Sequence, residues 1–441
     1  MSIHKDLSSI AEQAMQYAKT LGMDQSEVTL NQGTGVSVSV RQQALETIEK
    51  HNDSQVVVTV YKDHKTGSAS SADMSEQGIK KTVEAAASIA KFTGSDDCLG
   101  LADKALMATD LKDLDLYHPW HIDEQEMVEM ALQCEHSALQ YDKRITNSEG
   151  ASLDKYSGTS LYANSHGFIN QSKGSRHSIS CSVIGSTEQG MQRDYWYDSN
   201  RNAAYLMNAK EVGETAAQRT VKRLNARKVA STEVPVLFDP SMSKSLIGHL
   251  ISAIKGGVIY KKASFLLDQV GNNILPEFVT VSENPHLVGE SGSSMHDKEG
   301  VATPNYRAIV ADGVLQNYIL GSYTSRKLNL PTTANAGGVR NIRVSHSKIE
   351  FDELVSQIDE GLLVTELIGS GINMVTGDYS RGAAGFWIEN GEVQYPVEEI
   401  TVAGNLKDMY QNIVAIGSDI DQRGNLHCGS ILIQNLTIAG S

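Results

Sequence analysis

The alternation of apolar and polar residues near the N-terminus constrains the fold of this chain more than any other feature. Three such stretches follow one another with short breaks: "EVTLNQGTGVSVSV" (27–40), "ALETIEKH" (44–51) and "QVVVTVYKDHKTGSASS" (55–71). A period of two places apolar side chains on one face of a β-strand, and short breaks join antiparallel neighbours. These residues therefore predict an antiparallel meander that buries one face.

Amphipathic helices are predicted on both sides of this strand region, because apolar residues there recur at helical spacing. Asp123 and Glu126 form a predicted capping pair at the start of one of them. Alternating segments return at 144–200 and predict further strands. The helices are predicted at 7–22, from about Ser75, from Asp123 and at 211–225.

The second half of the chain is predicted to be rich in β-structure. "AIVADGVLQNYIL" (308–320) and "GFWIENGEVQYP" (385–396) place Asp-Gly or Asn-Gly between alternating segments, which favours a two-residue hairpin. No regular alternation of strands and helices indicates βαβ units. We therefore predict an α+β fold in two domains, with largely antiparallel sheet and flanking helices. The domains are an N-terminal α+β domain over 1–230 and a β-rich C-terminal domain over 231–441.

The charge balance argues against a nucleic-acid partner. The chain has 38 Lys and Arg and 53 Asp and Glu, a net charge of −15, and so acidic a surface repels phosphate. The four cysteines are far apart, which indicates free thiols in a reducing compartment. The N-terminus lacks an apolar signal segment, and no apolar run is long enough to span a bilayer. We expect a cytoplasmic protein without a membrane partner.

One histidine, His249, lies in an otherwise apolar predicted helix that begins at Asp239-Pro240. A helical zinc site needs a second ligand about one turn away. We therefore interpret His249 as a packing or half-exposed residue of the helix and predict no metal site. No G-x-S-x-G motif marks a serine nucleophile either, so we predict no catalytic residue. The positions one turn from the histidine are Ser245, Leu246, Ser252 and Ala253.

A polar segment near the C-terminus, "TGDYSRGAAG" (376–385), is the strongest candidate for contact with a ligand. It combines a charged pair with a tyrosine, a serine and glycines that allow close approach of another backbone. It is predicted to be a loop that precedes a rigid hairpin. Two interpretations stay open: a cluster of tight turns, or a site that contacts a peptide. The candidate contact residues are Asp378, Tyr379, Ser380 and Arg381.

Several long motifs resemble one known family, and the similarity covers nearly the whole chain. Four of them are "KTGSASSADMS" (65–75), "DKRITNSEG" (142–150), "LYANSHGF" (161–168) and "GGVIYKKASFLLD" (256–268). They are similar to the PmbA branch, also called TldE, of the TldD/PmbA family. Residues 377–414 resemble the C-terminal signature of that family. Its members are described as metallopeptidases, and one branch was historically named modulators of DNA gyrase.

The resemblance also bears on the helix of His249. In the TldD branch, the corresponding helix carries an HExxxH motif that binds the catalytic zinc. Aligned on "YKKASFL" (260–266), the first His corresponds to Gly248, the Glu to His249 and the second His to Ala253. Cys428 lies several residues beyond the position of the TldD cysteine ligand. The resemblance therefore implies no cofactor in this chain, with zinc on a TldD partner.

The resemblance implies a cytoplasmic heterodimer with a TldD-type subunit, whose zinc would activate a water for attack on a peptide carbonyl. This chain would supply chamber wall, substrate guidance and stability. Unfolded peptides would bind as added β-strands, in proteolysis or peptide maturation. Two alternatives stay open: a self-sufficient metallopeptidase with other ligands, or a non-enzymatic binding protein that acts on gyrase or another target. A homodimer of the chain alone also stays open.

Overall fold

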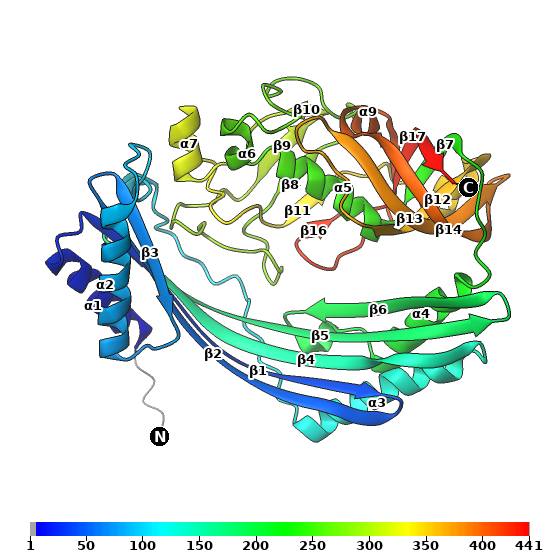
Figure 1. Cartoon of the computed structure of the whole chain (residues 1–441), viewed down its shortest axis with the longest axis horizontal. Coiled ribbons are helices and arrows are strands. Elements are labelled where there is room, and N and C mark those ends of the chain that lie inside the picture. The colour runs from blue at the N-terminus through cyan, green and yellow to red at the C-terminus, as the bar shows by residue number, and fades with distance from the viewer. Residues whose placement is uncertain (1–5, 441) are drawn as a thin grey trace.

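A computed structural model describes residues 6–440, and its first half is built on one long curved sheet (Figure 1). The sheet has six strands in the order β3-β2-β1-β4-β5-β6, and neighbouring strands are antiparallel. The predicted meander is present, although 44–51 and 55–62 form one strand because β1 continues to pair with β2 across residues 51–55. The strands are β1 (Gln25–Arg41), β2 (Ala44–Lys62), β3 (Lys65–Ser71), β4 (Ile145–Asn164), β5 (Ile169–Thr187) and β6 (Gly190–Asn200).

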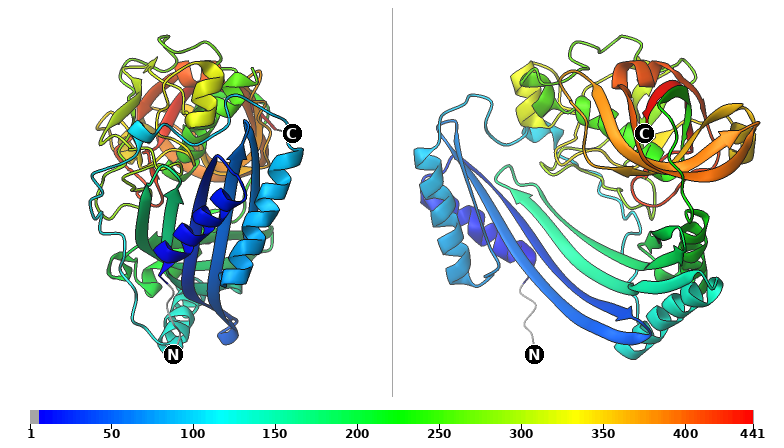
Figure 2. Two further views of the ribbon diagram at one scale, coloured as in Figure 1. Left: turned by 90° about the vertical axis from the view of Figure 1, so that its left-hand side faces the viewer. Right: turned by 45° about the vertical axis from the view of Figure 1, so that its right-hand side comes forward.

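Helices cover the convex face of this sheet (Figures 1 and 2). At one end α1 and α2 pack on the alternate apolar residues of β1 and β2, such as Val28 and Val58. At the other end α3 and α4 pack on residues such as Val38 and Leu153. The predicted meander face is therefore buried against helices. These helices are α1 (Leu7–Thr20), α2 (Glu76–Phe92), α3 (Glu124–Tyr141) and α4 (Ala209–Lys222).

Local signals account for the ends of two of these helices. The predicted capping box is present at α3, where Asp123 and Glu126 each accept the main-chain N–H of the other. Helix α4 begins before the predicted residue 211 because Asn208 caps it and accepts the Glu211 N–H (2.9 Å). No helix of the described residues is long and apolar enough to cross a membrane.

The concave face of the sheet is polar and faces the second half of the chain (Figure 1). Small hydroxyl residues follow one another across the strands, since Ser39 lies opposite Ser152 and Ser152 lies opposite Ser180. The Tyr156 side chain lies over Gly33, where an added Cβ would overlap its hydroxyl group. This face therefore carries hydrogen-bonding groups in place of a second apolar layer.

The second half of the chain contains a closed barrel. The strand order is β14-β13-β12-β7-β17-β15, and β14 also pairs with β17, which closes the barrel. Helix α5 (Pro240–Ala253) packs Leu246, Ile247 and Leu250 into the core that these strands share. The strands are β7 (Thr232–Phe238), β12 (Glu360–Ile368), β13 (Asp378–Glu389), β14 (Glu392–Asn405), β15 (Ile413–Ile416) and β17 (Ile431–Ala439).

A smaller sheet lies beside the barrel in the order β10-β9-β8-β11-β16. Within residues 6–440, parallel pairing of named strands is limited to β12 with β7 and β11 with β16. The strands of the smaller sheet are β8 (Val281–Glu283), β9 (Arg307–Ala311), β10 (Val314–Leu315), β11 (Ile342–Val344) and β16 (Leu426–His427). The short helices are η1 (Lys104–Leu106), η2 (Ala203–Tyr205), α6 (Gly256–Tyr260), α7 (Ser322–Leu328), α8 (Phe351–Ser356) and α9 (Leu406–Gln411).

The predicted α+β class with largely antiparallel sheet is confirmed. Both predicted hairpins are present, and Asp312 and Asn390 have the positive φ that their turns require. The loop predicted over 376–385 is wrong from residue 378 onward, because that segment forms the first part of β13. Its glycines bring the backbones close together: at Gly385, an added Cβ would overlap the Leu363 carbonyl of β12.

The segment 93–123 runs along one side of the molecule, beside the edge of β5, and links the second half to the curved sheet (Figure 2). It bonds to both, since the Leu116 carbonyl accepts the N–H of Ser175 in β5 (3.0 Å) and the Ala108 N–H donates to the Gly300 carbonyl (3.0 Å). These bonds hold the loops of the second half over the concave face. The four cysteines are free thiols in the structure.

Candidate functional site

Helix α5 places the histidine that stands out in the sequence inside a small polar cluster. The helix begins as predicted, with the Asp239 carboxylate accepting the Met242 N–H (2.9 Å). His249 Nε2 lies 3.3 Å from Ser245 Oγ, one turn earlier. Burial lowers the pKa of His249, and the positive charge of Arg381 lowers it further. The imidazole is therefore neutral near pH 7.

Strand β13 supplies the other members of this cluster, Tyr379 and Arg381. Arg381 donates from Nη1 to Ser245 Oγ (3.1 Å) and from Nη2 to the Leu367 carbonyl (3.3 Å). The Tyr379 ring packs edge-on against the His249 ring, with centroids 6.2 Å apart. Tyr379 is only 1% exposed, and burial raises its pKa to about 12 against the opposing effect of Arg381. The cluster thus holds a neutral imidazole, a protonated phenol and a cation.

This cluster does not fit a metal site. Gly248 faces open space, Ala253 is fully buried, and neither offers a ligand atom. The Arg381 guanidinium brings positive charge where a metal ion needs neutral or negative donors. Burial raises the pKa of the Cys428 thiol, which disfavours the thiolate that zinc binds. Among residues 6–440, no group of three or more His, Cys, Asp or Glu side chains is placed to hold a metal ion.

The four candidate contact residues divide between the two faces of β13. Asp378 and Ser380 are exposed, whereas Tyr379 is buried and Arg381 is half-buried beside α5. Asp378 and Arg381 do not form the charged pair inferred from the sequence, because residues three apart in a strand point to opposite faces. The Asp378 carboxylate accepts a hydrogen bond from Thr376 Oγ1 instead (2.6 Å). Contact of these four residues with a peptide stays a prediction.

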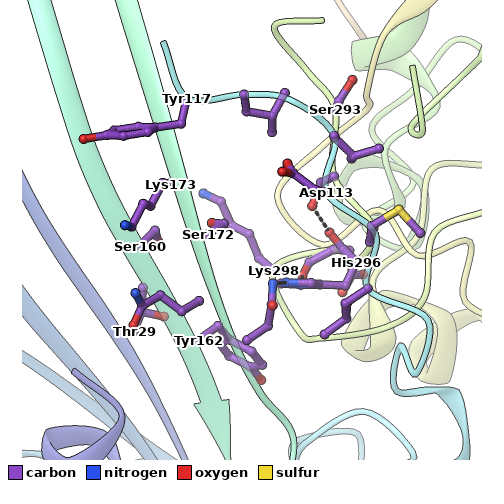
Figure 3. Close-up of a pocket in the computed structure, with 18 of the residues that line it drawn as sticks. Thr29, Asp113, Tyr117, Ser160, Tyr162, Ser172, Lys173, Ser293, His296 and Lys298 are labelled. Atoms are coloured by element: carbon purple, nitrogen blue, oxygen red, sulfur yellow. Dashed lines mark hydrogen bonds between the residues drawn. The ribbon is translucent and has the colours of Figure 1, made fainter. Parts of the chain in front are cut away.

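A cleft of about 1010 Å³ lies between the concave face of the sheet and the second half of the chain (Figure 3). Strands β1, β2, β4 and β5 form one wall. The loops 111–117 and 293–298, together with Arg340, form the other. Figure 3 shows Thr29, Ser160, Tyr162, Ser172 and Lys173 on the strand wall, and Asp113, Tyr117, Ser293, His296 and Lys298 on the loop wall.

The strand wall consists mainly of uncharged hydrogen-bonding side chains. Asn170 Nδ2 lies 2.9 Å from His296 Nε2, and this contact joins the two walls. Burial lowers the pKa of His296, so that its imidazole is neutral. The remaining polar groups can exchange hydrogen bonds with the main-chain N–H and C=O groups of an extended peptide. These groups belong to Thr29, Asn31, Gln55, Ser160, Gln171 and Ser172.

No local motif in the sequence marks this cleft, because its walls come from segments that are far apart along the chain. One signal was available, however. The positions that alternate with the buried residues of β1, β4 and β5 are hydroxyl and amide residues, as in Thr29 and Asn31 or Ser160 and Tyr162. Such a face is solvated or lines a site.

Comparisons with known proteins agree over the whole chain. Three profiles of PmbA/TldA metallopeptidases match it: domain 1 at 26–90, the central domain at 117–224 and the C-terminal domain at 231–440. Metalloprotease PmbA of Escherichia coli O157:H7 is 46% identical over 98% of this chain and 96% of its own length. The PmbA homolog of Haemophilus influenzae is also 46% identical, over 94% of this chain and 92% of its own length.

Solved structures share the entire fold. A candidate modulator of DNA gyrase from Bacteroides thetaiotaomicron matches with a TM-score of 0.93 and 28% identity, over 98% of this chain and 99% of that chain. TldE from Thermococcus kodakarensis matches with a TM-score of 0.81 over 98% and 100%, and its 20% identity shows the fold alone. The curved sheet, the barrel and these matches together place this chain in a class of metallopeptidase-related proteins. It belongs to the PmbA/TldD metallopeptidase family, and its sequence relatives include proteins named metalloprotease PmbA.

Proposed function

We propose that this chain is the PmbA/TldE subunit of a cytoplasmic TldD–TldE protease that acts on unfolded peptides, in proteolysis or peptide maturation. A TldD-type partner holds the zinc ion and its catalytic groups, and this chain supplies chamber wall and substrate guidance. The observation that carries the proposal is the α5 cluster. In a family of metallopeptidases, this chain has Gly248, His249 and Ala253 where a helical metal site needs ligands.

The concave face supports a role in holding peptides. Its hydroxyl and amide side chains can bond to any peptide main chain, which gives affinity with little preference for sequence. The edge of β2 from Ala44 to Asp53 is exposed and pairs with β1 alone among the described strands. Such an edge offers main-chain groups to an added strand, from a peptide or from a partner subunit.

A mixing experiment tests the proposal. This chain and a TldD-type subunit are purified separately, and cleavage of an unfolded polypeptide is measured for each alone and for the mixture. We expect cleavage by the mixture only, and loss of that cleavage when the partner is first treated with a chelator.

Two other results would reject the proposal in favour of its alternatives. Chelator-sensitive cleavage by this chain alone would show a self-sufficient metallopeptidase. An inactive mixture, together with binding of this chain to gyrase or another folded target, would show a non-enzymatic binding protein.

A further inference from the structure

Arg340 lines the cleft and adds a positive charge to it. Its guanidinium donates from Nη1 to the Gly338 carbonyl (3.1 Å), and it makes no ion pair with any described residue. A guanidinium has five N–H donors, and a buried cation is ordinarily paired. Arg340 is half-buried, and burial lowers its pKa. The residue lies in the lining of the cleft, and no described side chain pairs with its charge.

Two carboxylates act on the charge of Arg340, and both are engaged with other donors. Glu283 accepts hydrogen bonds from the Arg307 guanidinium and from Asn335 Nδ2 (2.9 Å). Asp297 accepts three main-chain N–H groups, at 2.8, 3.0 and 3.0 Å. Neither carboxylate forms an ion pair with Arg340 within the described part of the chain. The Arg340 guanidinium therefore has two carboxylates nearby but bonds to neither, and its free N–H donors can bind a further carboxylate.

Two of the lysines that line the same cleft as Arg340 form no ion pair among the described residues, and they lie one on each wall (Figure 3). Lys298 is exposed on the loop wall. Lys173 lies on β5, with its Nζ 5.6 Å from the centre of the Tyr117 ring. Among residues 6–440, neither ammonium group forms an ion pair. Three cations thus share one cleft without carboxylate partners of their own.

The other charged groups of the cleft are Lys112, Asp113, Asp115 and Asp297. Lys112 pairs with Asp110 (3.1 Å), and Asp115 pairs with His118 (3.2 Å). The Asp113 carboxylate accepts the Asp115 N–H (2.9 Å). Four cations (Lys112, Lys173, Lys298 and Arg340) and three aspartates thus line the cleft, which leaves a small excess of positive charge.

We propose that Arg340, Lys298 and Lys173 form a carboxylate-binding site, which holds the C-terminal carboxylate or an acidic side chain of an unfolded peptide in the cleft. The site rests on the proposed function, because it specifies the substrate class of the same chamber. The Arg340 fork suits two carboxylate oxygens at once, and the lysines add point charges from opposite walls. The uncharged side chains of the strand wall bond the main chain of the same peptide.

A carboxylate on a peptide fits this site better than a nucleic acid does. The net charge of −15 repels an extended polyanion over the whole surface. A single carboxylate on an otherwise neutral chain is governed by the charges within about one Debye length, ~10 Å. In the cleft those charges include the three unpaired cations.

Isothermal titration calorimetry on this chain alone tests the site. The ligands are three unfolded peptides of one Gly-Ser-Tyr sequence: a C-terminal acid, a C-terminal amide, and an amide with one internal glutamate. We expect the two carboxylate-bearing peptides to bind about tenfold more tightly than the plain amide, which is the scale of a charge-assisted hydrogen bond. High ionic strength should reduce that preference. Equal Kd values for all three peptides, or no binding of any, would overturn the proposal.

Substitutions of the three cations test whether these residues cause the preference for carboxylate-bearing peptides. Arg340→Ala should abolish most of it, and Arg340→Lys should retain part, because a lysine keeps the charge without the fork. Lys298→Gln and Lys173→Gln should each weaken binding of the acid by about 2- to 5-fold. Lys112→Gln is the matched control, because it removes the same charge from the same cleft although its Nζ is already paired with Asp110. Thermal unfolding verifies that each variant folds. If Arg340→Ala does not fold, the binding result for Lys298→Gln decides, because Lys298 is exposed.

Failure of this site and failure of the proposed function give different results. If the mixture with a TldD-type subunit cleaves the polypeptide but this chain binds the acid and amide peptides equally, the carboxylate site alone is wrong. If the preference is present but the mixture is inactive, the proposed function is wrong and the site stands. A preference that survives Arg340→Ala but is lost in Lys112→Gln would also overturn the assignment.

Discussion

Tyr379 lies between α5 and the barrel strands, and its ring fills core volume beside His249. Tyr379→Ala should lower the free energy of unfolding by ~3–5 kcal/mol, because it leaves a cavity in that core. Tyr379→Phe keeps the ring and removes a hydroxyl that makes no hydrogen bond of ordinary geometry within residues 6–440. It should change the free energy by less than ~1 kcal/mol. Urea denaturation measures both, and equal losses would contradict this placement.

The buried Asp297 makes the free energy of unfolding depend on pH. It is 1% exposed, and burial, followed by the charge of Glu299, raises its pKa from 3.8 to about 6. Between about pH 4 and pH 6 the folded chain therefore keeps a proton that the unfolded chain has released. Ionising Asp297 lowers the free energy of unfolding, an effect that is absent below about pH 4 and reaches about 3 kcal/mol above pH 6.

Asp297→Asn should remove that dependence. Its free energy of unfolding, relative to the wild-type chain, should rise as the pH increases from about 4 to about 7. The slope is the test, because the amide also loses an acceptor for one of the main-chain N–H groups that Asp297 binds. Denaturation curves at several pH values measure it, and a difference that stays constant with pH would contradict the raised pKa.

At the scale of single elements, substitution by alanine should change the free energy of unfolding in opposite directions at two glycines. Gly248 lies inside α5 and faces open space, so Gly248→Ala should raise the free energy of unfolding by ~0.5–1 kcal/mol. Gly385 lies in β13, where an added Cβ would overlap the Leu363 carbonyl of β12. Gly385→Ala should lower the free energy by ~1–3 kcal/mol. A stabilised Gly385→Ala chain would show that β12 and β13 do not approach as described.

The elements also show how far the sequence can predict this fold. The α3 cap at Asp123 and the β13–β14 turn at Asn390 are local, so a short stretch of residues was enough to predict each. The strand over 378–385 was missed because its glycines interrupt the apolar alternation. Closure of the barrel by Thr401 and Ala439 depends on pairing between distant segments. The cleft arises in the same way, from loops and strands that meet only in the folded chain.

At the scale of the whole molecule, stacked side chains join the two halves. The Arg423 guanidinium lies 4.0 Å from the centre of the Trp196 ring and 4.5 Å from that of Tyr197. It also donates to the Tyr197 carbonyl (3.0 Å) and to the Asp421 carboxylate (2.9 Å). These contacts tie the loop between β15 and β16 in the second half to β6 of the curved sheet.

Arg423→Ala should loosen this junction. Loss of a desolvated cation–π contact should lower the free energy of unfolding by about 2 kcal/mol, and the radius of gyration from X-ray scattering should increase as the halves separate. Arg423→Lys keeps the charge but loses the planar stack, so it should give a smaller change. A chain with unchanged stability and unchanged scattering would show that other contacts hold the halves together.

The zinc content of the separated subunits tests most directly whether this chain is the metal-free half of a two-subunit protease. Both subunits are prepared without chelator, mixed, shown to cleave an unfolded polypeptide, separated again and analysed for metal. We predict about one zinc per TldD-type subunit, the occupancy of a catalytic site, and no stoichiometric zinc on this chain. About one tightly held zinc per copy of this chain, with peptide cleavage that depends on that zinc, would contradict the conclusion that the α5 cluster offers no metal ligands.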